Sequence, residues 1–519
     1  MTRDVIIGID AGTSLIKAVA FSRDGEQLAM AARPNSYATG AGGRAEQDVA
    51  MTWREAAATL LELVDRMPTI RDRACALAIT GQGDGTWLID ADGEPVMPAL
   101  LWLDSRAADE TRRVREHPEY GNFYETTGTG AAPCQQSSQL AWLARQSPQA
   151  LARATTAFHC KDWLYFKLTG ERVTDPSEGV WTFGDFRTRR YHDLPLRIFG
   201  LNRYAGLLPP IVDGTVTSHP LTAAAAMQVK LPQGLPVVLG YVDVICTALG
   251  GGLFDPTVRA GLSVIGSTGV HLKYASTVDE VRLGANGDGY TICFPVPGTW
   301  AQMHSNLSAT LNIDWLLDVM RDVLAEAGVT RERRELVQAI DRLTQASGAG
   351  RILYHPYISA AGERGPFLAP QARASFTGLD SGTGLAELTR AVLEGLAMAA
   401  RDCFSAMGEI PEEVRVAGGA ARSNALRSIL AAVLDRPLRT FERDEAGASG
   451  AAMIAAVQQR HYPDMAACAA DWVEPYRGDL VRPDPALASI YANLFPLYVE
   501  TRQALAPLWT RLADLGERR

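Results

Sequence analysis

The stretch Val5 to Phe21, VIIGIDAGTSLIKAVAF, decides the fold that we expect. One apolar run ends at Asp10, a turn of small residues follows, and a second apolar run completes the stretch, which predicts two strands joined by a turn. In this turn Gly12 lets backbone N–H groups approach an anion closely, while Thr13 and Ser14 add hydroxyl donors. Asp10 is placed to hold a hydrated Mg²⁺ beside phosphates. An ordinary hairpin with an aspartate at its entry is the alternative interpretation.

The same pattern returns later in the chain. Residues Gly261 to Lys273 read GLSVIGSTGVHLK, and the turn of Gly266, Ser267 and Thr268 again lies between two apolar runs. Two such turns can face one nucleotide from opposite sides. The sequence therefore favours a site for a phosphorylated ligand between two similar halves.

A third glycine turn follows a predicted strand at residues 413–416. Gly418 and Gly419 form it, and Ser423 then opens an amphipathic helix. A strand, a glycine turn and a helix N-terminus favour an anion or a nucleotide base. No stretch matches a Walker-type phosphate loop or a dinucleotide-binding fingerprint, so neither of those sites is indicated.

Length and composition limit the class of protein. The chain has 519 residues, which suggests two domains, and we place them at residues 1–250 and 251–519. A net charge of −9 gives no basic surface for nucleic acid or an anionic membrane. The seven cysteines are scattered and read as reduced thiols, no apolar run approaches 18 residues, and the N-terminus lacks a signal-peptide pattern. We expect a cytoplasmic protein that neither spans a membrane nor binds nucleic acid.

The three turns together resemble the phosphate and adenosine segments of the actin-like ATPase superfamily, and further motifs narrow the resemblance to the FGGY carbohydrate kinases. These motifs are WLDSR at 102–106, KDWL at 161–164, GYVD at 240–243, GERGP at 362–366 and EAGASGAA at 445–452. The resemblance covers nearly the whole chain. It implies an α/β fold of two actin-like (ribonuclease H-like) domains with a cleft between them, and an enzyme that uses ATP and Mg²⁺.

The resemblance also assigns roles to particular residues. It implies that Asp243 is the general base that takes the proton of the attacking hydroxyl, while Asp10 positions Mg²⁺ through its water shell. From the residues alone, Asp243 could equally cap a helix over residues 244–249. The groups expected to contact the nucleotide are Gly12, Thr13, Ser14, Lys17, Gly266, Ser267, Thr268, Gly418, Gly419 and Ser423.

Six residues are expected on the substrate side of the cleft by the same resemblance. They are Gln82, Asp84, Trp102, Asp104, Arg106 and Cys134. Glycerol kinases carry an Arg-Glu pair at positions 83 and 84 and a tyrosine at 134, so this pocket should be roomier than theirs. The charged pair of the GERGP motif is expected to brace a domain interface and is left out of the site.

Among these kinases the runs at 82–87, 159–164 and 175–178 most resemble erythritol kinases, so the expected substrate is the small polyol erythritol. Another polyol or ketopentose, such as xylitol, xylulose, ribulose or glycerol, is the enzyme alternative. A different class, an actin-like ATP-binding sensor without catalysis, also stays open. A homodimer is compatible with the sequence.

Three further patterns predict helices. Thr52 to Glu55 has the form of a capping box and predicts that a helix starts there. Leu385 to Leu396 repeats apolar residues at helical spacing, and the residues beyond Ser489 predict a covering helix.

Overall fold

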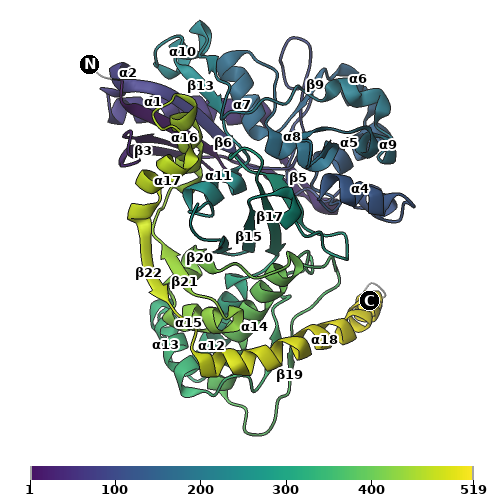
Figure 1. Cartoon of the computed structure of the whole chain (residues 1–519). Coiled ribbons are helices and arrows are strands. Elements are labelled where there is room, and N and C mark those ends of the chain that lie inside the picture. The colour runs from purple at the N-terminus through teal and green to yellow at the C-terminus, as the bar shows by residue number, and fades with distance from the viewer. Residues whose placement is uncertain (1–2, 517–519) are drawn as a thin grey trace.

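The computed structural model describes residues 3–516. Two mixed β-sheets lie one above the other in Figure 1, and helices pack against both. The first sheet has the strand order β12-β13-β6-β1-β2-β3, and the second has the order β16-β17-β15-β14-β20-β21-β22. Their strands are β1 (Val5–Ala11), β2 (Leu15–Phe21), β3 (Gln27–Pro34), β6 (Ala74–Gly81), β12 (His219–Pro220), β13 (Pro236–Leu239), β14 (Ala260–Ile265), β15 (Gly269–Ala275), β16 (Tyr290–Cys293), β17 (Trp300–Asn306), β20 (Glu413–Ala417), β21 (Leu438–Phe441) and β22 (Arg477–Val481).

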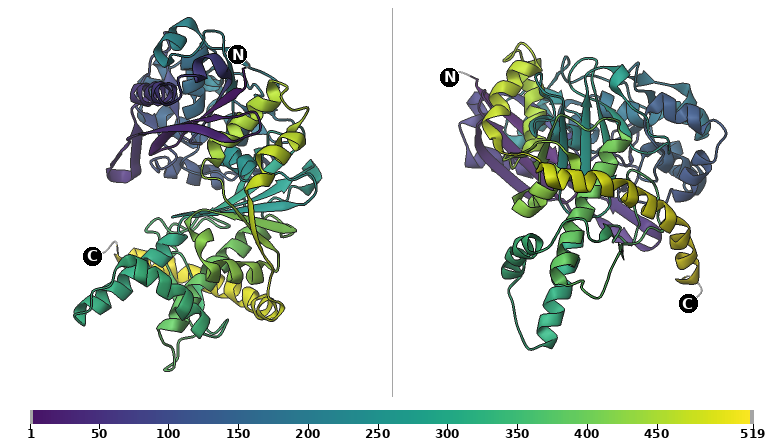
Figure 2. Two further views of the ribbon diagram at one scale, coloured as in Figure 1. Left: turned by 90° about the vertical axis from the view of Figure 1, so that its left-hand side faces the viewer. Right: turned by 60° about the horizontal axis from the view of Figure 1, so that its bottom comes forward.

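The helices cover the sheets and fill the ends of the molecule. They are α1 (Val49–Arg66), α2 (Ile70–Arg73), α3 (Ala108–Arg115), α4 (Tyr120–Thr127), α5 (Gln136–Gln146), α6 (Pro148–Arg153), α7 (Cys160–Thr169), α8 (Pro176–Phe183), α9 (Asp193–Ile198), α10 (Ala223–Val229), α11 (Asp243–Gly250), α12 (Thr310–Glu326), α13 (Arg333–Ala346), α14 (Leu385–Ala406), α15 (Asn424–Leu434), α16 (Ala446–Gln458), α17 (Met465–Trp472) and α18 (Pro485–Gly516). Within residues 3–516, no helix is long and apolar enough to cross a bilayer. The long helix α18 runs along the outer side of the lower half (Figures 1 and 2).

Small sheets and pairs of strands complete the structure. They are formed by β4 (Ala38–Gly40), β5 (Arg44–Gln47) and β8 (Ala99–Leu100), by β7 (Trp87–Ile89) and β9 (Thr156–Phe158), by β10 (Gly184–Asp185) and β11 (Arg190–Tyr191), and by β18 (Leu353–His355) and β19 (Ser375–Thr377).

The two large sheets repeat one arrangement around their central strands. β1 pairs antiparallel with β2 and parallel with β6, and β14 pairs antiparallel with β15 and parallel with β20. Val5, Ile7 and Ile9 pack in the core beside α1, whereas Ile6 packs in the core that contains α11 and α16. A central strand buried on both faces explains why the opening stretch is apolar without alternation. The predicted strand pairs on either side of both turns are confirmed.

Two helices join the halves through very close packing. α16 comes late in the sequence, yet it lies against α11 and against β1 and β6 of the first sheet (Figure 1). A Cβ on Gly450 would lie 1.9 Å from the carbonyl oxygen of Cys246, and a Cβ on Gly8 would lie 2.3 Å from that of Ala448. Only glycine fits at these positions, so the small residues allow α16 to pack closely on β1 and α11.

The predicted start of α1 is wrong. The helix begins at Val49, and the side chain of Asp48 accepts a hydrogen bond of 2.8 Å from the N–H of Met51. Thr52 is already inside the first turn, where its hydroxyl donates to the carbonyl oxygen of Asp48. Asp48 is the stronger cap because its carboxylate sits where the first free N–H groups point. The helices predicted at residues 385–396 and beyond Ser489 are confirmed as parts of α14 and α18.

Candidate active site

A cavity of about 300 Å³ lies between the two halves of the chain. Thr13, Asp84 and Asp243 line it from the first half, where they follow β1, β6 and β13. Thr268 lines it from the second half, in the turn between β14 and β15. Ligand sites collect at the carboxyl ends of such strands, because the chain turns there and exposes backbone and polar groups. The cavity therefore joins both predicted phosphate turns to the predicted base.

Asp243 is the first residue of α11, and Val242 occupies the N-cap position, so the capping alternative does not hold. Its carboxylate accepts a hydrogen bond of 2.6 Å from the N–H of Val244. Burial, and then the nearby carboxylates of Asp10 and Glu178, raise the pKa of Asp243 well above its usual value. A carboxylate that binds a proton this readily is suited to take one from an alcohol.

Asp10 lies near the end of β1, beside the start of α16. A Cβ on Gly447 would lie 2.3 Å from Oδ2 of Asp10, so the glycine leaves room for this carboxylate. Burial raises the pKa of Asp10 to about 6, against the opposing effect of Lys17. Among residues 3–516, no side chain or backbone N–H donates a hydrogen bond to the carboxylate of Asp10. Oxygen atoms without protein donors fit a hydrated Mg²⁺, which prefers carboxylate and water ligands.

Asp84 also lines the cavity. Its backbone adopts a left-handed conformation with φ of 55°, which aspartate tolerates better than most residues. Oδ2 accepts hydrogen bonds from the Cys134 thiol at 3.3 Å and from the Tyr290 hydroxyl at 3.5 Å. Oδ1 is buried and has no partner among the described residues. Asp84 lines the cavity, and a carboxylate oxygen without a donor is suited to a ligand hydroxyl.

Trp102 and Gln82 fix the hydroxyl of Thr13. The indole N–H of Trp102 donates to Oγ1 of Thr13 at 2.8 Å, and that hydroxyl donates to Oε1 of Gln82 at 2.9 Å. Gln82 in turn donates to Gln47 at 2.7 Å. Trp102 lines the cavity, whereas Gln82 is buried behind Thr13. These hydrogen bonds link the first phosphate turn to Trp102 in the cavity lining.

Asp104 and Arg106 lie outside the cavity lining. The guanidinium of Arg106 bonds to the carboxylate of Asp104 at 2.7 Å and to Glu46 at 2.8 Å, and it stacks over Trp142. The same oxygen of Asp104, Oδ2, also accepts from the N–H of Ala45. Both residues are paired within the protein and brace the loop that carries Trp102.

Two of the predicted nucleotide contacts have protein partners of their own. Lys17 pairs with Glu445 at 2.9 Å, across a sequence separation of 428 residues. Ser423 is the N-cap of α15, accepts from the N–H of Leu426 and donates to Asp341 at 2.9 Å. Neither side chain lines the cavity.

The glycine turn after β20 lies against the second phosphate turn. Gly418 has φ of +92°, and a Cβ there would lie 2.6 Å from the carbonyl oxygen of Ile265, directly before Gly266. Gly419 has open space around it. In the second phosphate turn, the N–H of Gly266 donates to the carbonyl oxygen of Thr268, and the carbonyl oxygen of Ser267 accepts from the N–H of Ala309.

In the first phosphate turn, the carbonyl oxygen of Gly12 accepts a hydrogen bond from the side-chain amide of Asn35. Ser14, two residues further on, is exposed.

The cavity residues that were not predicted include Trp181, Tyr290, Ser305 and Arg364. Arg364 belongs to the GERGP motif, so a signal for it was present in the sequence but was assigned to a domain interface. Tyr290 and Ser305 come from β16 and β17 and approach only through folding, so no local pattern could identify them.

Behind the cavity lies a fully buried charged cluster. Lys161 contacts Asp162 at 2.8 Å, Asp175 at 2.6 Å and Glu178 at 2.7 Å. Burial lowers the pKa of Lys161, but the three carboxylates outweigh burial and raise it well above its usual value. His159, Asp162 and Glu178 have ligand atoms close enough to hold a metal ion. The ammonium of Lys161 supplies the positive charge at this place, so the cluster needs no metal.

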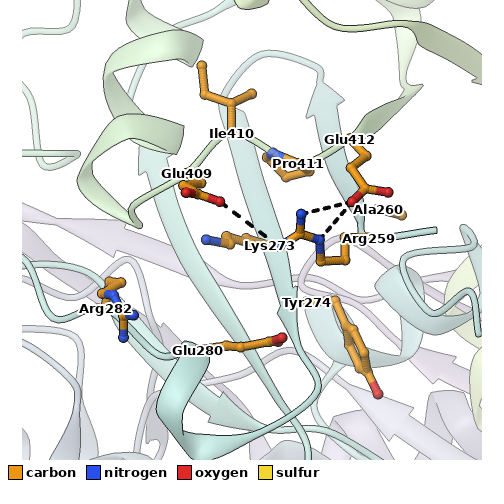
Figure 3. A pocket seen from close by; sticks show the side chains of 10 residues that line it. All are labelled: Arg259, Ala260, Lys273, Tyr274, Glu280, Arg282, Glu409, Ile410, Pro411 and Glu412. Carbon is orange, nitrogen blue, oxygen red and sulfur yellow. Dashed lines mark hydrogen bonds and ion pairs between the residues drawn. The ribbon is translucent and has the colours of Figure 1, made fainter.

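Another cavity, of about 210 Å³, lies at the far end of β14 and β15 (Figure 3). Arg259 and Glu412 pair at 2.8 Å on its rim, and Lys273 donates to the carbonyl oxygen of Met407. Lys273 is five residues along β15 from Thr268, a distance of about 17 Å in a strand. None of the predicted site residues lines this cavity.

Comparison with known proteins gives consistent matches over the whole chain. The model for the N-terminal domain of the FGGY family of carbohydrate kinases matches residues 5–250, and the model for its C-terminal domain matches residues 263–459. An erythritol kinase from Brucella abortus is 50% identical over 511 residues, which cover 98% of each chain. A xylulose kinase from Escherichia coli is 30% identical over 87% of this chain and 89% of its own.

Solved structures agree with the fold. A xylulose kinase from Rhodospirillum rubrum superposes with a TM-score of 0.87 and 26% identity, over 98% of this chain and all of that chain. The prediction of two actin-like α/β halves is therefore confirmed.

Proposed function

This chain belongs to the FGGY family of carbohydrate kinases, and we propose that it transfers the γ-phosphoryl group of ATP to a primary hydroxyl of erythritol. One observation carries the proposal: Asp243 and Asp84, both with raised pKa values, share one cavity with Thr13 and Thr268 of the two phosphate turns. The relative at 50% identity, an erythritol kinase, supports the choice of polyol.

In this proposal Asp243 accepts the proton of the substrate hydroxyl. The oxygen of that hydroxyl forms a bond to the γ-phosphorus, the bond from this phosphorus to the β–γ bridging oxygen breaks, and ADP leaves. The turns that carry Thr13 and Thr268 face the phosphates from opposite sides, the hydroxyl of Thr268 donates to them, and Asp10 would hold hydrated Mg²⁺, which neutralises phosphate charge. Gly418 and Gly419 border the adenosine. Residues 1–250 and 251–519 then form the two domains on either side of the cleft.

The cavity walls favour an uncharged polyol. Trp181, Val244 and Met303 give an apolar surface for the carbon chain, and Asp84 offers an unpaired acceptor. A carboxylate at this place accepts from hydroxyl groups and disfavours an anionic substrate.

Steady-state ADP release over a panel of acceptors tests the proposal. We expect the highest kcat/KM with erythritol, compared with glycerol, xylitol, xylulose and ribulose. A higher value with one of the other four compounds would reassign the substrate. ADP release that no acceptor accelerates would point to an ATP-binding sensor.

A further inference from the structure

Arg364 enters the cavity on a tightly held turn between β18 and β19. The buried carboxylate of Glu363 accepts hydrogen bonds through one oxygen from the N–H of Leu307 at 2.9 Å, of Arg364 at 2.8 Å and of Gly365 at 3.5 Å. Leu307 directly follows β17. One buried carboxylate thus holds the turn against the end of β17.

Gly365 brings the turn still closer to β17. A Cβ on this residue would lie 2.6 Å from the carbonyl oxygen of Ser305, so only glycine fits. The side chain of Asn306 donates to the carbonyl oxygen of Gly365 at 2.8 Å. The backbone of Arg364 is therefore held in place before any ligand arrives.

The side chain of Arg364 is held at its base and free at its end. Nε donates to Oγ of Ser305 at 2.8 Å, and the guanidinium lies 6.0 Å from the ring centre of Trp102, which belongs to the first half of the chain. Within residues 3–516, neither Nη1 nor Nη2 has a hydrogen-bond acceptor, and no carboxylate pairs with this cation. The two Nη groups of a fixed arginine, with four N–H donors between them, therefore remain available inside the cavity.

Arg364 and Asp84 have complementary roles across the cavity. The positive charge of Arg364 acts on both Asp84 and Cys134, whose thiol donates to Asp84. A carboxylate only accepts hydrogen bonds and a guanidinium only donates them, whereas a hydroxyl does both. A pair of neighbouring hydroxyls can donate to Oδ1 of Asp84 and accept from the Nη groups of Arg364.

We propose that Arg364 is a substrate-binding residue, contributed by the second half of the chain, that donates hydrogen bonds to the polyol hydroxyls facing Asp84. The inference rests on the proposed function and extends it. The polyol then contacts both halves at once, so substrate binding itself favours closure of the cleft. A contact of Arg364 with the phosphates of ATP, or a purely structural brace, is an outcome that the following test separates.

The test compares Arg364→Gln with Arg373→Gln, an exposed arginine in the same loop whose side chain bonds only to backbone carbonyls. We expect Arg364→Gln to lower kcat/KM for the polyol about 10- to 100-fold, mainly through KM, because a hydrogen bond from a charged donor is lost. The KM for ATP and the melting temperature should stay at the values of Arg373→Gln. Arg364→Lys, which keeps the charge but not the planar fork, should recover only part of the loss.

Three results would overturn the inference. Kinetics of Arg364→Gln equal to those of Arg373→Gln would show that the side chain does not bind the substrate. A rise confined to the KM for ATP would place Arg364 on the nucleotide, and a lowered melting temperature with uniform losses would make it a brace. All variants are measured with the acceptor that the wild-type chain uses best, so an error in the choice of erythritol does not affect this comparison.

Discussion

At the scale of single residues, Asp243 carries the chemical step in this account. We expect Asp243→Asn to lower kcat about 10²- to 10⁴-fold, because the amide cannot take the proton of the attacking hydroxyl. Affinity for ATP should change little, since the residue faces the acceptor. Single-turnover kinetics and nucleotide titration measure the two quantities separately. Near-normal turnover of the variant would remove Asp243 from the role of base.

Asp84 provides a test of substrate recognition. Asp84→Ala removes the unpaired acceptor and should cost about 1.5–3 kcal/mol in kcat/KM for erythritol. The loss of kcat/KM should be smaller with glycerol as the substrate, because its shorter chain reaches fewer polar groups.

Asp435→Ala is the matched control for Asp84→Ala. Asp435 also has a left-handed backbone, with φ of 51°, but it is exposed at the end of α15. Both substitutions place alanine at a left-handed backbone position, so both variants carry the same backbone strain. The additional loss of kcat/KM in Asp84→Ala therefore measures substrate recognition. Equal losses for both polyols, with a reduced melting temperature, would instead mean that Asp84 only shapes its turn.

At the scale of elements, the crossing of α11 and α16 connects stability with catalysis, because α11 begins with Asp243. Gly450→Ala places a methyl group against the carbonyl oxygen of Cys246 and should lower the free energy of unfolding by about 1–3 kcal/mol. Displacement of α11 should also lower kcat. Urea unfolding and steady-state rates measure both effects.

Gly121→Ala is the control for this helix substitution. Gly121 lies in α4, is exposed, and has no atom within 4 Å of an added Cβ. There the change should be neutral or should stabilise by up to about 1 kcal/mol through helix propensity. If the two variants have equal stability, the crossing is not tightly packed.

The elements also show what the sequence could and could not predict. Local patterns identified both strand pairs with their turns, because strand periodicity and small residues are visible within a dozen positions. The start of α1 was missed because two capping signals, Asp48 and Thr52, compete within one turn. The partners of Lys17 and Thr13 depend on contacts with residues far away in the sequence, Glu445 and Trp102, which no local pattern encodes. For the same reason, the sequence did not show that four residues expected on the substrate side do not line the cavity: Gln82, Asp104, Arg106 and Cys134.

At the scale of the whole molecule, the cavity is bounded by both halves, so its closure should depend on ligands. Erythritol together with a non-hydrolysable ATP analogue should reduce the radius of gyration measured by X-ray scattering, whereas either ligand alone should reduce it less. Closure excludes water from the phosphates until the acceptor is bound. A radius that is the same in all ligand states would indicate a cleft formed in advance.

Transfer of the γ-phosphoryl group from ATP to erythritol in this cleft is tested directly in one reaction mixture. ADP, inorganic phosphate and phosphorylated erythritol are quantified together, with ³¹P NMR for the phosphorus species. We expect equal amounts of ADP and erythritol phosphate, no inorganic phosphate above background, and loss of both products in Asp243→Asn. ADP accompanied by an equal amount of inorganic phosphate, without phosphorylated erythritol, would contradict it.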